Sequence, residues 1–487
     1  MTDVVFLDRA VVVLYFLVTM GAAALVSRHI ASFDDFLVAG RRLSAPLLIC
    51  TLVSTYYGLG VLLAGSEISY EAGLVNWFFD TAPSYVLMFL AALLVAAKVR
   101  QRDFRSVPDI IEAYYGRGAR VMVATASFVY ALPAFSIMGM GGLFHLLFGI
   151  PFVWGMVLGS AVTLAYTAMG GLLAVAVTDA LQFLIMATTL ALAAAIGLPK
   201  VGGVPEMVRV LPDHFHPMGD RPLGMLVVYG LTSLSILIEP AFYQRIFAAR
   251  STRTVIVALS VGVVLWMSYD WIITMLGIGA RVAEIKGLIG PPPSPENAVT
   301  QFVLRVLPVG LTGLFAAGLM AAAMSTMDSY LLISASTLVY DIWRPLWSRQ
   351  MSDAALVRWT RLTLVVATGA NIAVCLYFLN VERLWIFMTA ILICTALVPV
   401  LAALYWPGVK RRAGAAAAAT GLGLVCAYYA WVDLAGQWLE DEAAYVWQGR
   451  LLGVDLQLNQ DYGILYILPL VIAVFLVAQL APGGRPR

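Results

Sequence analysis

The sequence predicts an all-α, polytopic membrane protein with about thirteen transmembrane helices. Of its 487 residues, 61% are hydrophobic and only 12% are charged, whereas soluble domains average roughly 45–50% apolar and about 25% charged residues. A membrane-spanning helix needs about 20 mostly apolar residues, and this chain holds enough of them for about thirteen spans. The composition excludes a soluble multidomain enzyme. A net charge of +2, with no basic stripe, argues against nucleic-acid binding.

The spans follow from apolar length and from the charges, prolines and glycines that interrupt it. The first span follows an acidic rather than basic N-terminus, so we interpret it as permanent and not as a cleaved signal peptide. The ninth is long, and a separate short helix is expected before it, over residues 298–307. The predicted spans cover residues 6–26, 44–68, 75–97, 119–148, 152–169, 171–197, 223–244, 255–279, 308–340, 362–380, 384–406, 414–434 and 463–481.

The distribution of Lys and Arg predicts the orientation of the chain. Cytoplasmic loops of membrane proteins carry an excess of these residues. With the N-terminus outside and thirteen spans, the inner segments hold 21 of the 30 basic residues. We therefore expect the N-terminus outside, the C-terminus inside, and an odd number of spans.

Acidic residues inside the spans are the first indication of function. Charged groups at bilayer depth are costly and are usually functional. No Lys or Arg falls well inside a span, and Arg245 lies near the inner end of the seventh. Acids without buried bases need a metal ion, a proton or a cationic substrate as partner, unless they face water or the backbone. The acids are Asp80, Asp179, Glu239, Asp270 and Asp328.

Hydroxyl groups in the ninth span suggest an ion site. Helical spacing places Ala322, Ser325, Thr326 and Ser329 near one face, with Asp328 beside Ser325. Hydroxyl and carboxylate oxygens are hard ligands that suit a small hard cation. The alternative is that these side chains only hold helices together by packing and hydrogen bonding.

Three other spans contain polar irregularities. The second contains Ser54-Thr-Tyr-Tyr-Gly58-Leu-Gly60, and glycines beside polar residues at mid-depth suggest a broken helix whose free carbonyls could bind a cation. A glycine-lined packing groove would produce the same pattern. The sixth carries Asp179 and Gln182 on one face. In the seventh, Glu239 precedes a helix-kinking proline.

From about residue 30 to 410 the chain resembles the sodium/solute symporter family, which includes sodium-coupled glucose, proline and pantothenate transporters. Any one of the matching segments would be weak, but their order and depth together are specific. The segments are residues 33–42 (FDDFLVAGRR), 51–74 (TLVSTYYGLGVLLAGSEISYEAGL), 166–172 (YTAMGGL), 178–182 (TDALQ), 244–251 (QRIFAARS) and 318–341.

The resemblance implies a LeuT-like core of two inverted five-helix repeats. Residues 1–42 would form an additional N-terminal helix and inner loop, and residues 408–487 two C-terminal helices. The first repeat would cover residues 43–198 (spans two to six), residues 199–222 an outer loop, and residues 223–407 the second repeat (spans seven to eleven).

The resemblance also implies the ion ligands. The principal sodium site would use the carbonyls of Ser54, Tyr57 and Ala322 and the hydroxyls of Ser325 and Thr326. Some members resemble a two-sodium design. Here the second site would use Asp179, Asp328 and Ser329 together with Ser325.

The substrate region departs from the best-known members of the family. Near the middle of the membrane no Arg or Lys is available to pair with a substrate carboxylate. We therefore expect a cationic or amine-bearing solute, attracted by acids. A neutral polar solute stays open, and a simple mono-anion is least favoured. The candidate substrate residues are Tyr56, Gly58, Asp80, Glu239 and Asp270.

Together these features predict a multi-pass cell-membrane transporter that couples sodium to uptake of a small organic solute by alternating access. Na⁺ is the expected coupling ion, with no organic cofactor, no nucleic-acid partner and no obligate protein partner besides the bilayer. Proton coupling on the same fold is the main alternative. A membrane sensor or enzyme is a weaker one, because the only enzyme-like pair, His214 and His216, lies in an outer loop.

Overall fold

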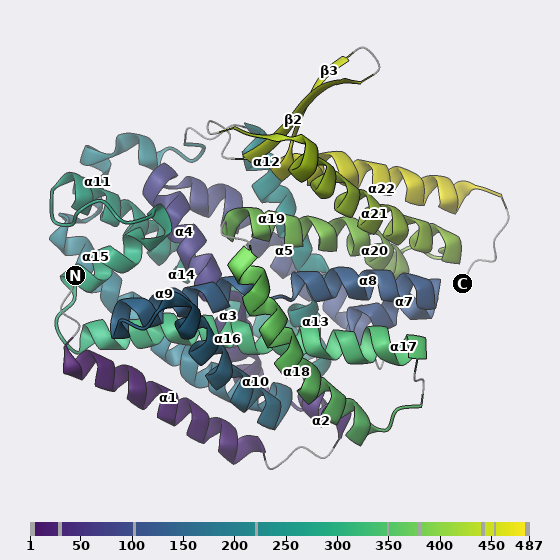
Figure 1. Cartoon of the computed structure of the whole chain (residues 1–487), viewed down its shortest axis with the longest axis horizontal. Helices are drawn as coiled ribbons and strands as arrows, with labels where there is room; N and C mark the ends of the chain where they lie inside the picture. Colours follow the sequence, from purple (N-terminus) through teal and green to yellow (C-terminus); the bar gives the residue numbers. More distant parts are fainter. Residues whose placement is uncertain are drawn as a thin grey trace.

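The computed structural model describes residues 5–27, 32–100, 104–219, 223–347, 350–377, 381–439, 444–451 and 454–482 (Figure 1). The helices of the first half are α1 (Phe6–Val26), α2 (Phe33–Val38), α3 (Ala45–Tyr56), α4 (Leu59–Ala72), α5 (Ala82–Leu90), α6 (Ala96–Arg100), α7 (Val107–Tyr115), α8 (Arg117–Tyr130), α9 (Ala134–Phe148), α10 (Phe152–Lys200) and α11 (Gly203–Val210). Those of the second half are α12 (Leu223–Thr232), α13 (Pro240–Ala248), α14 (Thr252–Ile285), α15 (Ala298–Val306), α16 (Leu311–Ser336), α17 (Arg344–Trp347), α18 (Asp353–Tyr377), α19 (Val381–Leu392), α20 (Val398–Tyr405), α21 (Arg411–Ala435) and α22 (Gly463–Leu480).

Membrane-length apolar helices dominate the described residues. Eleven are long and apolar enough to cross a membrane, or twelve if α3 and α4, bent by 53°, count as one span. The sequence predicted about thirteen. The difference lies in α10, whose 49 residues contain Gly171 in a non-helical conformation (φ 53°, ψ −149°). At about 1.5 Å per residue α10 would measure roughly 74 Å, more than twice a hydrocarbon core. Counting its two halves separately gives the predicted number.

The described residues also contain one small β-sheet, which the all-α prediction did not include. It follows α21 and has the antiparallel order β1–β2–β3. The strands are β1 (Gln437–Leu439), β2 (Ala444–Leu451) and β3 (Val454–Asn459). Figure 1 shows the β2–β3 hairpin projecting away from the helices. The sequence predicted the two spans on either side of this segment and no strand between them. The short helix expected over residues 298–307 is present as α15.

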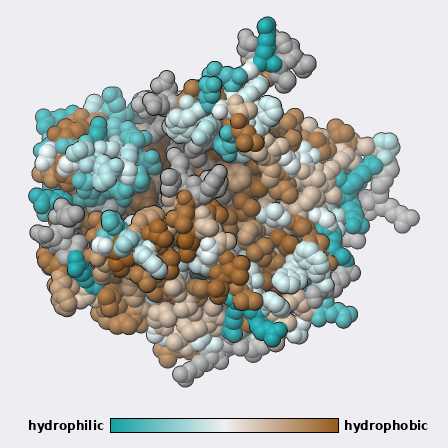
Figure 2. All heavy atoms as spheres, in the orientation of Figure 1, coloured by the Kyte–Doolittle hydropathy of each residue, from teal (hydrophilic) through white to brown (hydrophobic). Residues whose placement is uncertain are grey.

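The helix α16 forms the centre of the bundle. Some 89% of its most apolar stretch is buried, against 22% for α1. It packs against α10, α1, α9 and α3. Figure 2 shows apolar residues across the middle of the visible face and hydrophilic residues toward its ends, as expected for a surface that meets lipid.

The N-terminal helix is tied to this centre through one buried side chain. Asp8 of α1 is 2% exposed, and its Oδ1 accepts hydrogen bonds from the main-chain N–H groups of Gly310 (2.8 Å) and Gly313 (2.7 Å). A carboxylate at a helix N-terminus satisfies N–H groups that have no helical partner. Asp8 therefore caps α16 from a neighbouring helix.

Candidate ion and substrate site

The predicted break in the second span is present. Helix α3 ends at Tyr56, and Tyr57 leaves the helical region (ψ 46°) before Gly58 begins α4 in an extended conformation. A Cβ atom on Gly58 would lie 1.9 Å from Oγ1 of Thr326. Only glycine fits this approach, so the break packs directly on α16.

Four of the five residues predicted for the principal sodium site meet at this break. Ser325 Oγ donates to the carbonyl of Ser54 at 2.9 Å and lies 3.2 Å from the carbonyl of Ala322. Thr326 Oγ1 donates to the carbonyl of Thr55 at 2.9 Å and lies 3.3 Å from that of Ala322. Two hydroxyl and three carbonyl oxygens therefore converge between α3 and α16.

This donor set fits a small hard cation. Carbonyl and hydroxyl oxygens are the ligands that such ions prefer over softer nitrogen or sulfur groups. Tyr57, the fifth predicted ligand residue, lies at the C-cap of α3. The carbonyl of Thr55, which the sequence analysis did not include, faces Thr326. The fit supports the predicted ligand set, whose occupation by sodium stays a prediction.

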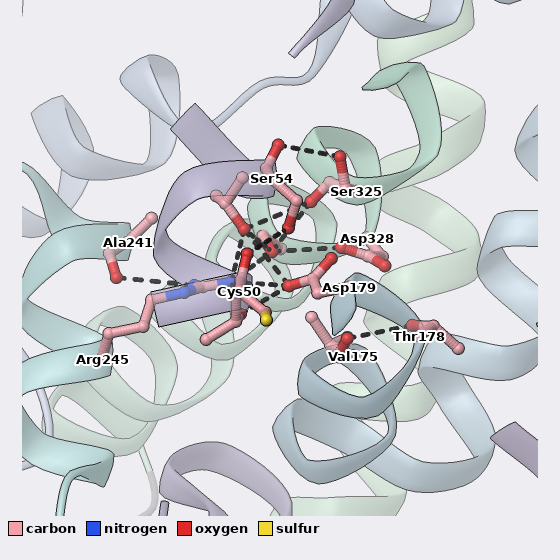
Figure 3. Close-up of polar contacts among 12 residues, drawn as sticks. Cys50, Ser54, Val175, Thr178, Asp179, Ala241, Arg245, Ser325 and Asp328 are labelled. Carbon is pink, nitrogen blue, oxygen red and sulfur yellow. Dashed lines mark hydrogen bonds and ion pairs between the residues drawn. The ribbon is translucent and has the colours of Figure 1, made fainter. Parts of the chain in front are cut away.

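A second polar cluster lies one helical turn away (Figure 3). Asp179 of α10 accepts a hydrogen bond at 2.5 Å from Thr51 of α3, and Thr55 lies 3.0 Å from Ser329 of α16. Asp328 accepts hydrogen bonds from Tyr166 (2.6 Å) and from the neighbouring Ser329. These side chains are at most 1% exposed. The cluster contains Asp179, Asp328 and Ser329, three of the four residues predicted for the second ion site.

Arg245 corrects the expectation that the membrane acids lack a buried base. This side chain of α13 is 1% exposed, and its Nη2 donates to Thr55 Oγ1 at 2.8 Å and to Ser329. It lies 3.7 Å from Oδ2 of Asp179. The α12–α13 segment is broken, so α13 is short and directs Arg245 inward between α3 and α16 instead of toward the membrane edge.

The charges of this cluster do not balance when both acids are ionised. The cluster contains two carboxylates, Asp179 and Asp328, but a single guanidinium, that of Arg245, which lies 3.7 Å from Asp179. Oδ1 of Asp179 has no hydrogen-bond partner within the described residues. An uncompensated charge at zero exposure is strongly unfavourable. One further monovalent cation would neutralise the cluster.

Glu239 of the predicted substrate set lies beside the break in α3–α4. It precedes α13 as its N-cap, and Oε2 accepts hydrogen bonds from the main-chain N–H of Phe242 (2.5 Å) and from the hydroxyl of Tyr56 (2.8 Å). The residue is fully buried, and Oε1 has no hydrogen-bond partner in the described part of the chain. Tyr56 also packs edge-on against Phe242 and Trp266. A carboxylate with one free oxygen beside aromatic rings can attract a cation.

Asp270 and Asp80 are the other two acids predicted for the substrate site. Asp270 of α14 is 3% exposed and accepts a hydrogen bond from the hydroxyl of Tyr57. The side chain of Asp80 lies outside the described residues. The structure therefore brings Glu239 and Asp270 to the two tyrosines at the break, Tyr56 and Tyr57.

Sequence reasoning missed Thr51, Thr55, Tyr166 and the inward position of Arg245. The i, i+4 spacing of Thr51 and Thr55 was a usable signal, because it places two hydroxyls on one face of α3. The proline after Glu239 indicated the break before α13, but no pattern in the sequence specified the angle that directs Arg245 inward. No group of three or more His, Cys, Asp or Glu with metal-binding geometry occurs among the described residues, and these include His214 and His216.

The fold and the site define a multi-pass helical membrane protein with a broken helix and a buried oxygen-rich site at its centre. The profile of the sodium:solute symporter family matches residues 36–423. The chain belongs to the sodium:solute symporter family.

Several known transporters are similar to this chain. The osmoregulated proline transporter of Bacillus subtilis is 28% identical over 294 residues, which cover 57% of this chain and 58% of that protein. The sodium/pantothenate symporter of Escherichia coli is 22% identical over 434 residues, 84% of this chain and 88% of that protein. The sodium/glucose cotransporter of Vibrio parahaemolyticus is 25% identical over 399 residues, 74% and 73% respectively. The chain thus matches little more than half the length of the proline transporter.

Solved structures confirm the fold. A Na⁺-coupled sialic acid symporter in a substrate-bound, outward-open state superposes with a TM-score of 0.81 at 18% identity, covering 100% of both chains. A nucleobase-cation-symport-1 family transporter gives a TM-score of 0.56 at 12% identity, covering 92% of this chain and 95% of that one. The predicted division into inverted repeats, additional helices and loops stays a prediction.

Proposed function

We propose that the protein is a secondary active transporter that couples sodium entry to the uptake of a small organic solute. The observation that carries the proposal is the contact between the α3–α4 break and α16. There the carbonyls of Ser54 and Thr55 face the hydroxyls of Ser325 and Thr326 at 2.9 Å. Family membership and the sodium-coupled relatives support the same reading.

The transport mechanism follows from where this ion site lies. A sodium ion between the break and α16 holds the two elements together, and Glu239, beside the same break, favours substrate in that arrangement. By linkage, substrate must tighten sodium binding by the same factor. At a membrane potential of −100 mV each sodium moved inward contributes about 2.3 kcal/mol, which adds to the ion gradient and drives uptake.

The deciding experiment measures thermal stability of the purified protein in nanodiscs against sodium concentration, at constant ionic strength. A ligand that binds only the folded state raises stability with its concentration. We expect sodium to stabilise the protein and potassium or choline not to. Thr326→Ala should weaken apparent sodium affinity by tenfold or more, because it removes a ligand oxygen.

Ser334→Ala is the matched control, since Ser334 is a buried residue of α16 whose hydroxyl bonds to the carbonyl of Leu331 on its own helix. Its sodium response should equal that of the wild type. A response to pH with none to sodium would instead favour proton coupling, for which the excess acid at Asp179 and Asp328 is the supporting observation. No response to either would contradict ion-coupled transport.

We further propose that the solute carries an amine or another cationic group, drawn by Glu239. The experiment screens amines, neutral polar solutes and mono-anions for stabilisation in saturating sodium. For a cationic hit, Glu239→Gln should reduce affinity at least tenfold while keeping the cap on α13, since an amide oxygen still accepts from Phe242 and Tyr56. Glu239→Asp, which keeps the charge, is the control. Unchanged amine affinity in Glu239→Gln would refute this assignment.

A further inference from the structure

Three successive basic residues gather at the start of α21. They are Lys410, Arg411 and Arg412, and each donates to main-chain carbonyl oxygens. Lys410 Nζ lies 2.9 Å from the carbonyl of Ala481, and Arg411 Nε lies 3.0 Å from that of Tyr115. Arg412 bonds to carbonyls at the end of α22. No described acid forms an ion pair with any of the three. Because carbonyls are neutral, none of the described residues compensates these three positive charges.

Two open grooves flank this basic cluster. One, of about 440 Å³, lies between α21 and the α7–α8 corner, and the other, of about 390 Å³, runs along α22. Both volumes fall within the range of small-molecule sites, roughly 300–1,000 Å³. Arg412 lines both. The first is lined by Tyr115, Gly118, Ala119, Met122, Lys410, Arg411, Arg412 and Ala415, and the second by Arg412, Ala473, Val474, Val477, Ala478 and Ala481.

Neighbouring aromatic residues place the cluster at the membrane–water boundary. Tyr405 and Trp406 are 40% and 41% exposed, and such rings concentrate where headgroups lie. Lys98 adds a fourth cation close by, with Nζ 3.7 Å from the centre of the Tyr405 ring. Val477, less than one turn before the end of α22, is 70% exposed on the apolar side of the second groove. The basic side chains therefore lie next to an apolar surface of α22 at the depth of the membrane–water boundary.

We propose that the basic cluster and its two grooves form a binding site for an anionic phospholipid. The phosphate would lie against Lys410, Arg411 and Arg412, and an acyl chain would follow the alanine and valine wall of α22. Basic pockets between membrane helices are a recognised way of holding anionic headgroups. A free phosphate ion would leave the apolar wall unused, so the lipid is the occupant that matches both parts. Bound there, it would join α21 and α22 to α8.

The test compares phosphatidylglycerol with phosphatidylcholine on purified protein in neutral detergent at physiological salt. Bound lipid is counted by native mass spectrometry, and affinity is taken from the rise in thermal stability. Phosphatidylglycerol should bind and stabilise, and Lys410→Gln/Arg412→Gln should weaken it roughly 30-fold, as expected for two basic residues near an anionic headgroup. Arg412→Lys keeps the charge and should retain most of the affinity.

Arg253→Gln is the matched control, because Arg253 is an exposed arginine in the first turn of α14 and lines neither groove. It should bind phosphatidylglycerol like the wild type. Equal loss in this control, or equal binding of phosphatidylcholine, would overturn the proposal. Stabilisation by millimolar inorganic phosphate to the same extent would also overturn it, since it would indicate a free-anion site. The apparent stability of each variant without lipid separates misfolding from lost binding.

Discussion

At the scale of single residues, sequence reasoning found the ligand types but not all of their partners. Ser54, Ala322, Ser325 and Thr326 come together as the family resemblance implied. Their side-chain and carbonyl chemistry is visible in a linear sequence. The ion pair between Arg245 and Asp179 is not, because it joins residues 66 positions apart across a broken helix whose angle no local pattern specifies.

Asp328→Asn should abolish cation binding at the cluster of Asp179, Asp328 and Arg245. It should leave sodium binding at the principal site intact. The amide is isosteric and can still accept from Tyr166, but it removes the one negative charge that Arg245 does not balance. We expect equilibrium binding of radioactive sodium to fall from two ions per protein to one.

Asp433→Asn serves as the control for this count, since Asp433 bonds to Gln460 at the far end of α21. Two ions bound to Asp328→Asn would contradict the charge argument. If the wild type bound only one ion, Arg245 alone would be sufficient to neutralise the cluster, and sodium would bind only at the principal site.

At the scale of elements, length and apolarity predicted most helices, and glycine and proline predicted three of their breaks, including the one before α13. The glycines of the second span correctly indicated the α3–α4 break. The boundary between the fifth and sixth spans falls at Gly171, whose positive φ and close approach to α2 require glycine. The β1–β3 sheet was missed, because its short strands lie in a polar segment whose pairing depends on contacts with α21 and with each other.

Gly171→Ala should destabilise the fold by about 1–3 kcal/mol. Its backbone conformation (φ 53°, ψ −149°) is one that side-chain-bearing residues rarely adopt, and an added Cβ would lie 2.3 Å from the carbonyl oxygen of Phe36. Thermal unfolding in nanodiscs measures the effect. Gly142→Ala, in α9 with open space around it, should change stability little. Equal stability of the two variants would show that the turn tolerates a side chain.

At the scale of the whole molecule, the fold is confirmed but the orientation in the membrane rests on charge alone. Basic residues flank α2 and α7 and begin α17 and α21, and these helix ends lie toward one side in Figure 1, with α11 and α15 toward the other. This separation agrees with the positive-inside pattern. Composition was sufficient for the membrane class, whereas the path of each helix depends on packing against α16.

The predicted orientation can be tested with single cysteines in a variant that lacks the four native ones. Asp213→Cys, in the segment between α11 and α12, should react with an impermeant maleimide on intact cells. Arg253→Cys, at the start of α14, should react only after permeabilisation. Both residues are exposed, so accessibility within the fold does not confound the comparison. The reverse pattern would place the N-terminus inside.

The position of Arg245 has an electrical consequence. Its guanidinium is an elementary charge carried by α13, deep inside the bundle and within the field of a polarised membrane. Any movement of α13 along the membrane normal displaces that charge, with work of about 2.3 kcal/mol for each 100 mV fully crossed. A voltage step applied without solute should therefore produce a brief capacitive current from the protein itself. That current would report the motion of α13 separately from the current carried by transported ions.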